Sequence, residues 1–277
     1  MKTSPVTISL TRYNEPNWLL LQTLESLANQ KGIEAEVLFL DQMDDPEIQS
    51  KVDSLNSDTI KFKRRLIPAK SLSYARNLAI QEAENDLILF IDSDAIADKH
   101  WAHNLASAFN NPDVAIAGGR ISLKWHKKPL AIAKARIVQE QYSGLELGAD
   151  TIPVHRIVGA SFAINRKLLA ENAYFDESLG RREGKLYSGE ESDLCKRTLE
   201  AGHIILYKGN SYVQHQVLPE RIRYRWIFTR LFYAGFGRSR SGGTPSPSHN
   251  IKFWDYFFLP IILPFYLAGF ITEKLQQ

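Results

Sequence analysis

The stretch LILFIDSDAIADKHW, residues 87–101, decides how this sequence folds. An apolar run ends at Asp92, and Asp92 and Asp94 then place two carboxylates one residue apart, with Ser93 between them. An apolar run of this length bounded by polar residues predicts a buried strand over 86–92. Two acids at the end of a buried strand repel each other unless a positive group lies there. The stretch therefore also predicts a binding site for something cationic.

The two aspartates are candidate ligands for a divalent cation. Mg²⁺ and Mn²⁺ prefer oxygen ligands and often share them with substrate phosphates. The alternative is a pair of ordinary turn residues, because Asp is frequent in turns. A phosphatase of the aspartyl-phosphate type also has a strand followed by Asp-x-Asp. That motif usually lies early in the chain with Thr or Val after the second Asp, whereas here Ala95 follows and a third of the chain precedes it.

Strands and helices alternate around this stretch. We expect strands at 6–10, 36–41, 60–66, 86–92 and 114–123, and helices at 17–30, 71–85 and 99–111. Nearly continuous apolar strands between helices predict an α/β fold with a mostly parallel sheet that is buried on both faces. Ligands bind beyond the carboxyl ends of such strands. Polar residues after three strands, at 11–14, 41 and 92–94, are therefore expected to meet at one edge.

The second half of the chain contains further candidate residues. Residues 156–171 predict a strand that leads into a helix, residues 188–202 predict a helix, and HIILY, residues 203–207, predicts a strand. Glu190 and Glu191 begin the second helix, where the helix dipole favours acids whatever their function. They follow a glycine-containing loop, and a carboxylate near a hydroxyl can act as a general base. His215 follows the last strand; it is a structural residue or a metal ligand.

Composition limits the class of protein. The 277 residues suit one large domain or a domain with an appendage, and the net charge is +3. Cys195 is the single cysteine, which excludes an internal disulfide and multi-cysteine metal sites and fits a reducing compartment. The N-terminus lacks the apolar region of a secretory signal. We therefore expect a cytoplasmic catalytic body.

The C-terminal region is basic and aromatic. The segment 219–240 is either a solvated helix with a core face or an interfacial segment whose arginines meet anionic head groups. We favour the membrane surface and expect no nucleic acid. The arginines are Arg221, Arg223, Arg225, Arg230, Arg238 and Arg240.

An apolar tail follows a linker at 241–248. Residues 253–271 are almost long enough to span a bilayer. Asp255, Pro260 and Pro264 count against a clean spanning helix. An amphipathic or shallow re-entrant anchor is expected, with packing against a partner chain as the alternative.

Several stretches, taken in order, resemble the family 2 glycosyltransferases of the GT-A fold over about residues 5–240. They are VTISLTRYNEPNWLLLQTLESLANQKG, VLFLD, SLSYARNLAIQEAENDLILFIDSDA, FDESL, GEESDLCKR, AGHIILY and YVQH. The resemblance implies a GT-A domain at 1–218, with a nucleotide-binding half at about 1–120 and an acceptor half at about 121–218. Its fold would be a mixed, mostly parallel sheet flanked by helices. Residues 219–277 would form a C-terminal helical or amphipathic extension.

The resemblance also implies roles for donor-binding residues. Thr11 and Tyr13 would line the nucleobase pocket, and Asp41 would accept a hydrogen bond from the base, uracil being commonest in this family. Arg76 would approach the diphosphate or shape the base pocket. The family often has Asp-Asp-Gly-Ser after the second strand, where this chain has DQMDD at 41–45. The loss of the glycine turn leaves base preference open.

The same resemblance implies a metal site and its neighbours. Asp92 and Asp94 would hold Mn²⁺ or Mg²⁺ on the donor phosphates, with Ser93 beside them. His215 would complete the metal site.

On the acceptor side, Glu191 would be the catalytic base, although the family usually has Asp there. Glu190, Gly159 and Ala160 would lie beside the acceptor.

The implied reaction is an inverting transfer of a sugar from a nucleotide-sugar donor, with UDP-sugars foremost, to a hydroxyl of a glycan or polyprenyl-linked acceptor. Cell-surface or extracellular polysaccharide synthesis at the inner face of the cell membrane would fit the tail. A sugar nucleotidyltransferase is an alternative, but it would have a glycine-rich basic loop where this chain has TRYNEP. A non-catalytic scaffold is another, although Asp94 and Glu191 are both present.

Overall fold

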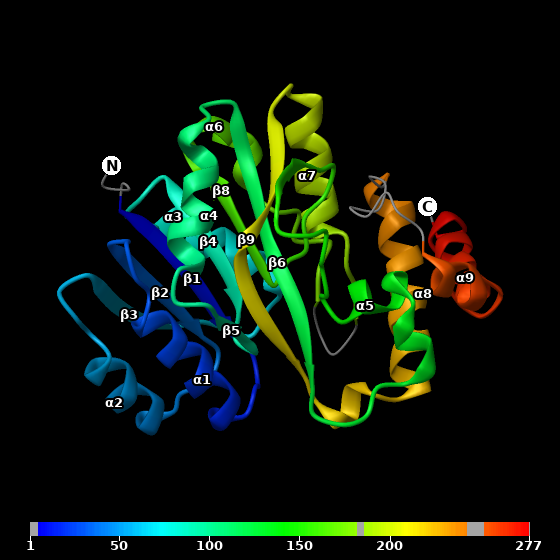
Figure 1. Cartoon of the computed structure of the whole chain (residues 1–277), viewed down its shortest axis with the longest axis horizontal. Coiled ribbons are helices and arrows are strands. Elements are labelled where there is room, and N and C mark those ends of the chain that lie inside the picture. Colours follow the sequence, from blue (N-terminus) through cyan, green and yellow to red (C-terminus); the bar gives the residue numbers. More distant parts are fainter. Residues whose placement is uncertain (1–4, 182–185, 243–251, 277) are drawn as a thin grey trace.

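The computed structural model describes residues 5–181, 186–242 and 252–276. Within these ranges a nine-stranded sheet has the order β3-β2-β1-β4-β8-β6-β9-β5, and β7 pairs with β9 (Figure 1). The strands are β1 (Val6–Arg12), β2 (Ala35–Asp41), β3 (Ile60–Leu66), β4 (Leu87–Asp92), β5 (Ala95–Ala97), β6 (Val114–Trp125), β7 (Thr151–Pro153), β8 (Ser161–Asn165) and β9 (Ile204–Val217). The helices are α1 (Asn17–Ala28), α2 (Pro46–Ser54), α3 (Leu72–Glu82), α4 (Trp101–Ala106), α5 (Arg136–Gln141), α6 (Arg166–Leu169), α7 (Glu190–Glu200), α8 (Tyr224–Ser241) and α9 (Phe253–Lys274).

The predicted mixed α/β fold with flanking helices is confirmed. Strands β3, β2, β1 and β4 pair in parallel, as do β6 and β9. Strand β8 runs antiparallel to both β4 and β6, and β5 and β7 run antiparallel to β9. Parallel pairing therefore dominates the first half of the chain, and the second half adds the antiparallel strands.

Strand register brings the predicted polar edge together. Thr11 is the partner of Asp92 across β1 and β4, and Arg12 is the partner of Asp41 across β1 and β2. Every residue of β2 is buried, as continuous apolar strands predict. The polar edge is thus carried by strands that the main hydrophobic core holds in place.

The helices expected at 17–30, 71–85 and 188–202 are each two to four residues shorter in the structure, and two further elements are shortened more. The helix expected at 99–111 ends at Ala106 and continues as a 3₁₀ turn over Ser107–Asn110, before the Pro112 that cannot extend it. The strand expected from residue 156 begins at Ser161. Residues 156–160 instead form a loop, and this loop passes the site described below.

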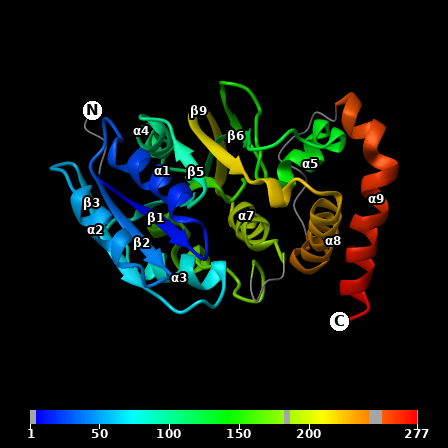
Figure 2. The same cartoon turned by 90° about the horizontal axis from the view of Figure 1, so that it is seen from below.

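The C-terminal region forms a helical layer beside the sheet. Figure 2 shows α8 between α7 and α9, with α9 outermost. A second hydrophobic cluster joins α5, α8 and α9 to the end of β9. The predicted boundary at 218/219 lies just after β9, and it stays a prediction. Most of the predicted linker, from 243 on, lies outside the described residues.

Helix α9 is continuous over Phe253–Lys274. The shallow re-entrant anchor that the sequence predicted would need a turn within this segment, and α9 has no such turn. Pro260 and Pro264 lie inside it, both exposed on its outer side, so the helix keeps its packed inner side on α8. Asp255 is buried, and its carboxylate accepts hydrogen bonds from the N–H groups of Ile137 (3.1 Å) and Lys252 (2.9 Å). By length and composition α9 could cross a membrane, and most of it is exposed.

Glycines let α8 and α9 touch through their backbones. A Cβ at Gly235 would collide with the carbonyl oxygen of Tyr266, and a Cβ at Gly269 would collide with that of Phe232. Small residues at helix crossings permit this close approach. The two helices therefore pack as one unit.

Candidate active site

Three residues form a group that could hold a metal ion. One ligand atom from each of Asp92, Asp94 and His215 lies within 4.8 Å of the others. Ala95 of β5 pairs with His215 of β9, which explains how a residue so distant in sequence reaches the strand end. The two carboxylates are ligands that suit Mn²⁺ or Mg²⁺, and an imidazole beside them is a ligand that transition metals accept more readily than Mg²⁺ does. The residues present therefore fit the predicted cation.

Asp94 is the more strongly held of the two aspartates. His215 Nε2 lies 3.1 Å from its Oδ1, and Arg221 Nη1 donates to its Oδ2 at 3.0 Å. Burial acts to raise the pKa of Asp94, but His215 and Arg221 outweigh it and hold that pKa far below its usual range. Burial and the charge of Asp94 raise the pKa of Asp92. The two acids thus differ in how readily they ionise.

Arg76 joins the metal group to the acids of α7. Its guanidinium lies 2.9 Å from Glu191 Oε1, 3.4 Å from Glu190 Oε1 and 3.9 Å from Asp92 Oδ1. Ser71 caps α3 by accepting from Tyr74 N–H, and this helix presents Arg76. One buried arginine therefore fixes the relative positions of the strand-end acids and the helix-start acids.

Glu190 and Glu191 have opposite protonation tendencies. Burial and the charge of Glu191 raise the pKa of Glu190 to about 7. Burial also acts on Glu191, but the charge and hydrogen bond of Arg76 outweigh it and lower the pKa of Glu191. The Glu191 side chain is 17% exposed, against 4% for Glu190. Glu191 is thus the ionised and more accessible acid of the pair.

The loop before β8 lies against these acids. A Cβ at Gly159 would collide with Glu191 Oε1 and with the Arg76 guanidinium, so a larger residue there would displace these two side chains. Arg76 Nη2 also donates to the Gly159 carbonyl at 3.3 Å. Gly159 lines the cavity, whereas Ala160 is buried in the core.

The predicted nucleobase side is only partly open. Thr11 and Tyr13 line the cavity, and Tyr13 is half exposed. Asp41 is fully buried: Arg64 donates to its Oδ2 at 2.7 Å, and Met43 N–H donates to its Oδ1 at 3.0 Å. The Asp41 carboxylate therefore already has partners.

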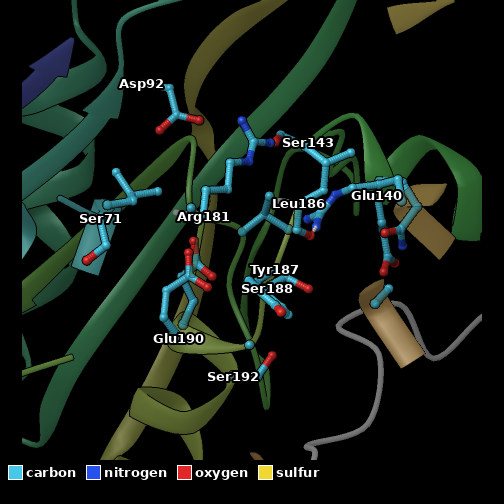
Figure 3. A pocket seen from close by; sticks show the side chains of 18 of the residues that line it. Ser71, Asp92, Glu140, Ser143, Arg181, Leu186, Tyr187, Ser188, Glu190 and Ser192 are labelled. Carbon is cyan, nitrogen blue, oxygen red and sulfur yellow. Dashed lines mark hydrogen bonds between the residues drawn. The ribbon is translucent and has the colours of Figure 1, made fainter. Parts of the chain in front are cut away.

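A cavity of about 590 Å³ connects these groups. Its lining includes strand-end residues and the two acids of α7: Thr11, Asp92, Ser93, Asp94, Glu190 and Glu191. Figure 3 shows the side chains of Asp92, Arg181 and Glu190 around its inner part. His215 is buried behind Asp94. The structure thus brings most of the predicted site residues to one cavity.

Sequence reasoning missed the arginines of this cavity. Arg221, Arg230 and Arg238 were expected to face lipid head groups, but they line the cavity. Arg223 and Arg225 are exposed. Arg230 and Arg238 share a helical face because they are eight residues apart, a spacing that could have indicated their common direction.

Helix α9 also lines the cavity, which the sequence reasoning did not predict. Its contribution comes from one face, at spacings of three and four residues: Leu259, Ile262, Leu263 and Tyr266.

Comparison with known proteins gives a family match. The model of "Glycosyl transferase family 2" matches residues 7–172. A glucosyl-dolichyl phosphate glucuronosyltransferase of Haloferax volcanii is 24% identical over 61% of this chain and 55% of its own length. The chain thus spans about half the length of that relative.

Solved structures are similar in fold. A mannosyltransferase from Pyrobaculum calidifontis in complex with GDP-Man and Mn²⁺ has a TM-score of 0.60 at 16% identity, over 98% of this chain and 75% of that one. GalNAc-T7 with UDP, GalNAc and Mn²⁺ has a TM-score of 0.59 at 15% identity, over 92% of this chain and 54% of that one.

Proposed function

Because the chain belongs to glycosyl transferase family 2, we propose that it is an inverting, metal-dependent glycosyltransferase. It would move a sugar from a nucleotide-sugar donor to a hydroxyl of a glycan or lipid-linked glycan. One observation carries this proposal: Arg76 joins an ionised acid, Glu191, to the metal-binding group at Asp92, on a single cavity. Base and donor site are thereby held at a fixed spacing.

Asp92, Asp94 and His215 would hold the divalent cation. When bound there, Mn²⁺ or Mg²⁺ supplies positive charge beside the diphosphate that leaves. Arg221 already donates to Asp94, so this side chain would keep Asp94 oriented and remain next to the phosphates.

Glu191 would be the general base. Arg76 keeps its carboxylate ionised and aims it, and the second oxygen is left to take the proton of the acceptor hydroxyl. The acceptor oxygen then bonds to the anomeric carbon as the bond to the diphosphate oxygen breaks on the opposite face. Because the pKa of Glu190 is raised to about 7, this acid would be only partly ionised at neutral pH, which reduces the negative charge beside the base.

Thr11 and Tyr13 would contact the nucleobase, which we propose to be uracil. Solved proteins of this fold hold UDP in one case and GDP-Man in another. Asp41 would accept a hydrogen bond from the base only if the Arg64 guanidinium, which now donates to its carboxylate, moved away.

Helix α9 supports a place at the membrane. Its exposed apolar side chains would enter the cytoplasmic face of the lipid layer, where a lipid-linked acceptor is found. A relative named for glucosyl-dolichyl phosphate is consistent with such an acceptor. Surface polysaccharide synthesis would follow from this location.

The first test is donor binding by calorimetry. UDP-, GDP- and dTDP-sugars are titrated with Mn²⁺, Mg²⁺ or EDTA into wild type, Asp94→Asn and the control Asp98→Asn, an exposed residue of the same stretch. We expect metal-dependent binding of the UDP-sugars, about tenfold or more weaker in Asp94→Asn. Absence of binding by folded wild type would refute the donor site and favour a non-catalytic scaffold. Release of pyrophosphate from a nucleotide triphosphate and a sugar phosphate would instead indicate a nucleotidyltransferase.

A further inference from the structure

The cavity that holds Glu191 also has a wall of a different kind. Two arginines, Arg181 and Arg230, line this cavity together with apolar side chains of α9. A nucleotide sugar has no long apolar part that would use such a wall. A molecule that joins an anionic group to a hydrocarbon chain would use both.

Arg230 is short of partners. Its Nη1 donates to the Leu186 carbonyl at 2.8 Å, but its buried Nε has no hydrogen-bond partner within the described residues. Burial and the nearby charge of Arg181 lower the pKa of Arg230 to about 10, so it stays cationic at neutral pH. A desolvated cation is stabilised when an anion with hydrogen-bonding oxygens lies against it.

Arg181 adds a second positive charge. Its backbone is fixed, because Leu72 N–H donates to its carbonyl at 3.2 Å and Ser73 Oγ donates to the Leu179 carbonyl at 3.0 Å. Its side chain makes no ion pair within 4 Å among the residues that the structure describes. Figure 3 shows this side chain reaching into the cavity on the side of Asp92. Arg181 acts electrostatically on Asp92 and Asp94 as well as on Arg230, so it lies within range of both groups. Two cations that line one cavity favour an anion there.

The position of Arg230 points to the acceptor. Its charge contributes to the pKa values of both Glu190 and Glu191, so it lies within electrostatic range of the proposed base. It comes from α8, the helix packed against α9, and Leu259, Ile262 and Leu263 of α9 line the same cavity. The base, the Arg230 guanidinium and the apolar wall therefore line the same cavity.

We propose that Arg230 and Arg181 bind a phosphate of the acceptor, whose hydrocarbon chain lies along the apolar face of α9 inside the cavity. The acceptor would then be a sugar joined through phosphate to a prenyl-type chain, with its sugar hydroxyl at Glu191. This assignment rests on the proposed function, because it places the acceptor in the cavity that holds the base.

Three small probes distinguish binding of the phosphate group from binding of the hydrocarbon chain. Citronellyl phosphate has both, citronellol lacks the phosphate, and inorganic phosphate lacks the chain. Each is titrated into the full-length protein, as wild type, Arg230→Gln, Arg181→Gln and the control Arg225→Gln, an exposed arginine of the same helix. UDP with Mn²⁺ is titrated into the same four proteins, and a thermal melt checks that each is folded.

We expect wild type to bind citronellyl phosphate at least tenfold more tightly than either partial probe. Each cavity variant should weaken this binding about tenfold or more, since hydrogen bonds to charged groups are lost. Arg225→Gln should bind citronellyl phosphate as tightly as wild type does. All four proteins should bind UDP with Mn²⁺ equally well. Arg181→Gln keeps the test valid if Arg230→Gln does not fold, because the Arg181 side chain makes no ion pair among the described residues.

Two outcomes overturn the inference. Citronellol could bind as tightly as citronellyl phosphate, or both arginine variants could bind citronellyl phosphate as tightly as wild type. Either result would show that Arg230 and Arg181 recognise no phosphate. If UDP binding falls as much as citronellyl phosphate binding, the arginines serve the donor diphosphate. Failure of the proposed function looks different: UDP would not bind wild type, while arginine-dependent binding of citronellyl phosphate would remain.

Discussion

The parallel half of the sheet and the α8–α9 pair both supply charged side chains to one cavity, but they hold them in different ways. Asp92 is placed by strand register against Thr11, inside the main core. Arg230 is placed by the rotation of a helix about its axis, in a layer with its own smaller cluster. The first arrangement leaves a polar edge, and the second leaves an apolar outer face. We infer that strand ends fix the metal-binding acids and that helix packing fixes the wall that receives the acceptor.

The largest expected effect tests whether the chemistry depends on the acid of α7 that Arg76 holds. Glu191→Gln keeps the shape and the oxygen that Arg76 contacts but cannot take a proton. We expect the rate of sugar transfer to fall about 10²–10⁴-fold, with donor binding retained. Initial rates with saturating donor measure this.

The matched control is Glu200→Gln, an exposed acid at the other end of the same helix. A normal transfer rate in Glu191→Gln would remove Glu191 as base and move the chemistry to another part of the cavity.

The next effect tests whether the exposed face of α9, and not the surface of the sheet half, binds a lipid layer. Phe253 and Phe257 are 70% and 59% exposed, and replacing both by Ser removes apolar area that a lipid layer would bury. We expect binding to phosphatidylcholine vesicles to weaken about tenfold or more, because each buried Phe contributes roughly 1.5–3 kcal/mol. Vesicle co-sedimentation measures it.

The comparison variant is Leu66→Ser/Tyr174→Ser, which removes exposed apolar residues remote from the C-terminal helices. An equal loss of vesicle binding in this variant would show that attachment is not a property of α9.

The smallest effect concerns pH and the acid beside the base. The pKa of Glu190 is raised from its ordinary value of 4.5 to about 7, so the folded protein holds a proton that the unfolded chain has released. The contribution of Glu190 therefore makes folding less favourable as pH rises from about 4.5 to 7, and is constant above. Glu190→Gln removes this loss. Its free energy of unfolding relative to wild type should rise over that window by about 1–3 kcal/mol.

Urea unfolding at several pH values measures this difference. The pKa of Glu191 is lowered from its ordinary value of 4.5, so this acid stabilises the folded protein above pH 4.5. That stabilisation is lost as the pH falls below 4.5. A pH-independent difference between Glu190→Gln and wild type would contradict the raised pKa.

Local patterns predicted the parallel half of the fold well. The strand that ends at Asp92 and the helix that presents Arg76 both follow from short runs of apolar and capping residues. Long-range contacts were beyond such patterns. Arg221 meets Asp94 across 127 positions, and Asp41 is satisfied by Arg64 of the neighbouring strand. Neither pairing changes the local periodicity of the sequence.

The C-terminal helices show the same limit. Hydropathy predicted an apolar tail, but the face of α9 that would line a cavity depends on how α8 folds back against the acids. Glu191 was identified through its motif, whereas its tie to Arg76 depends on segments 115 positions apart.

The contact of Gly235 with Tyr266 and of Gly269 with Phe232 has a mechanical consequence. Side chains between two helices can change rotamer and absorb a displacement, but two touching backbones cannot. A tilt of α9 would therefore move α8 with it. Because Gly237 of α8 also lies against the Ser188 carbonyl, just before Glu190, such a tilt would reach the loop that precedes the base.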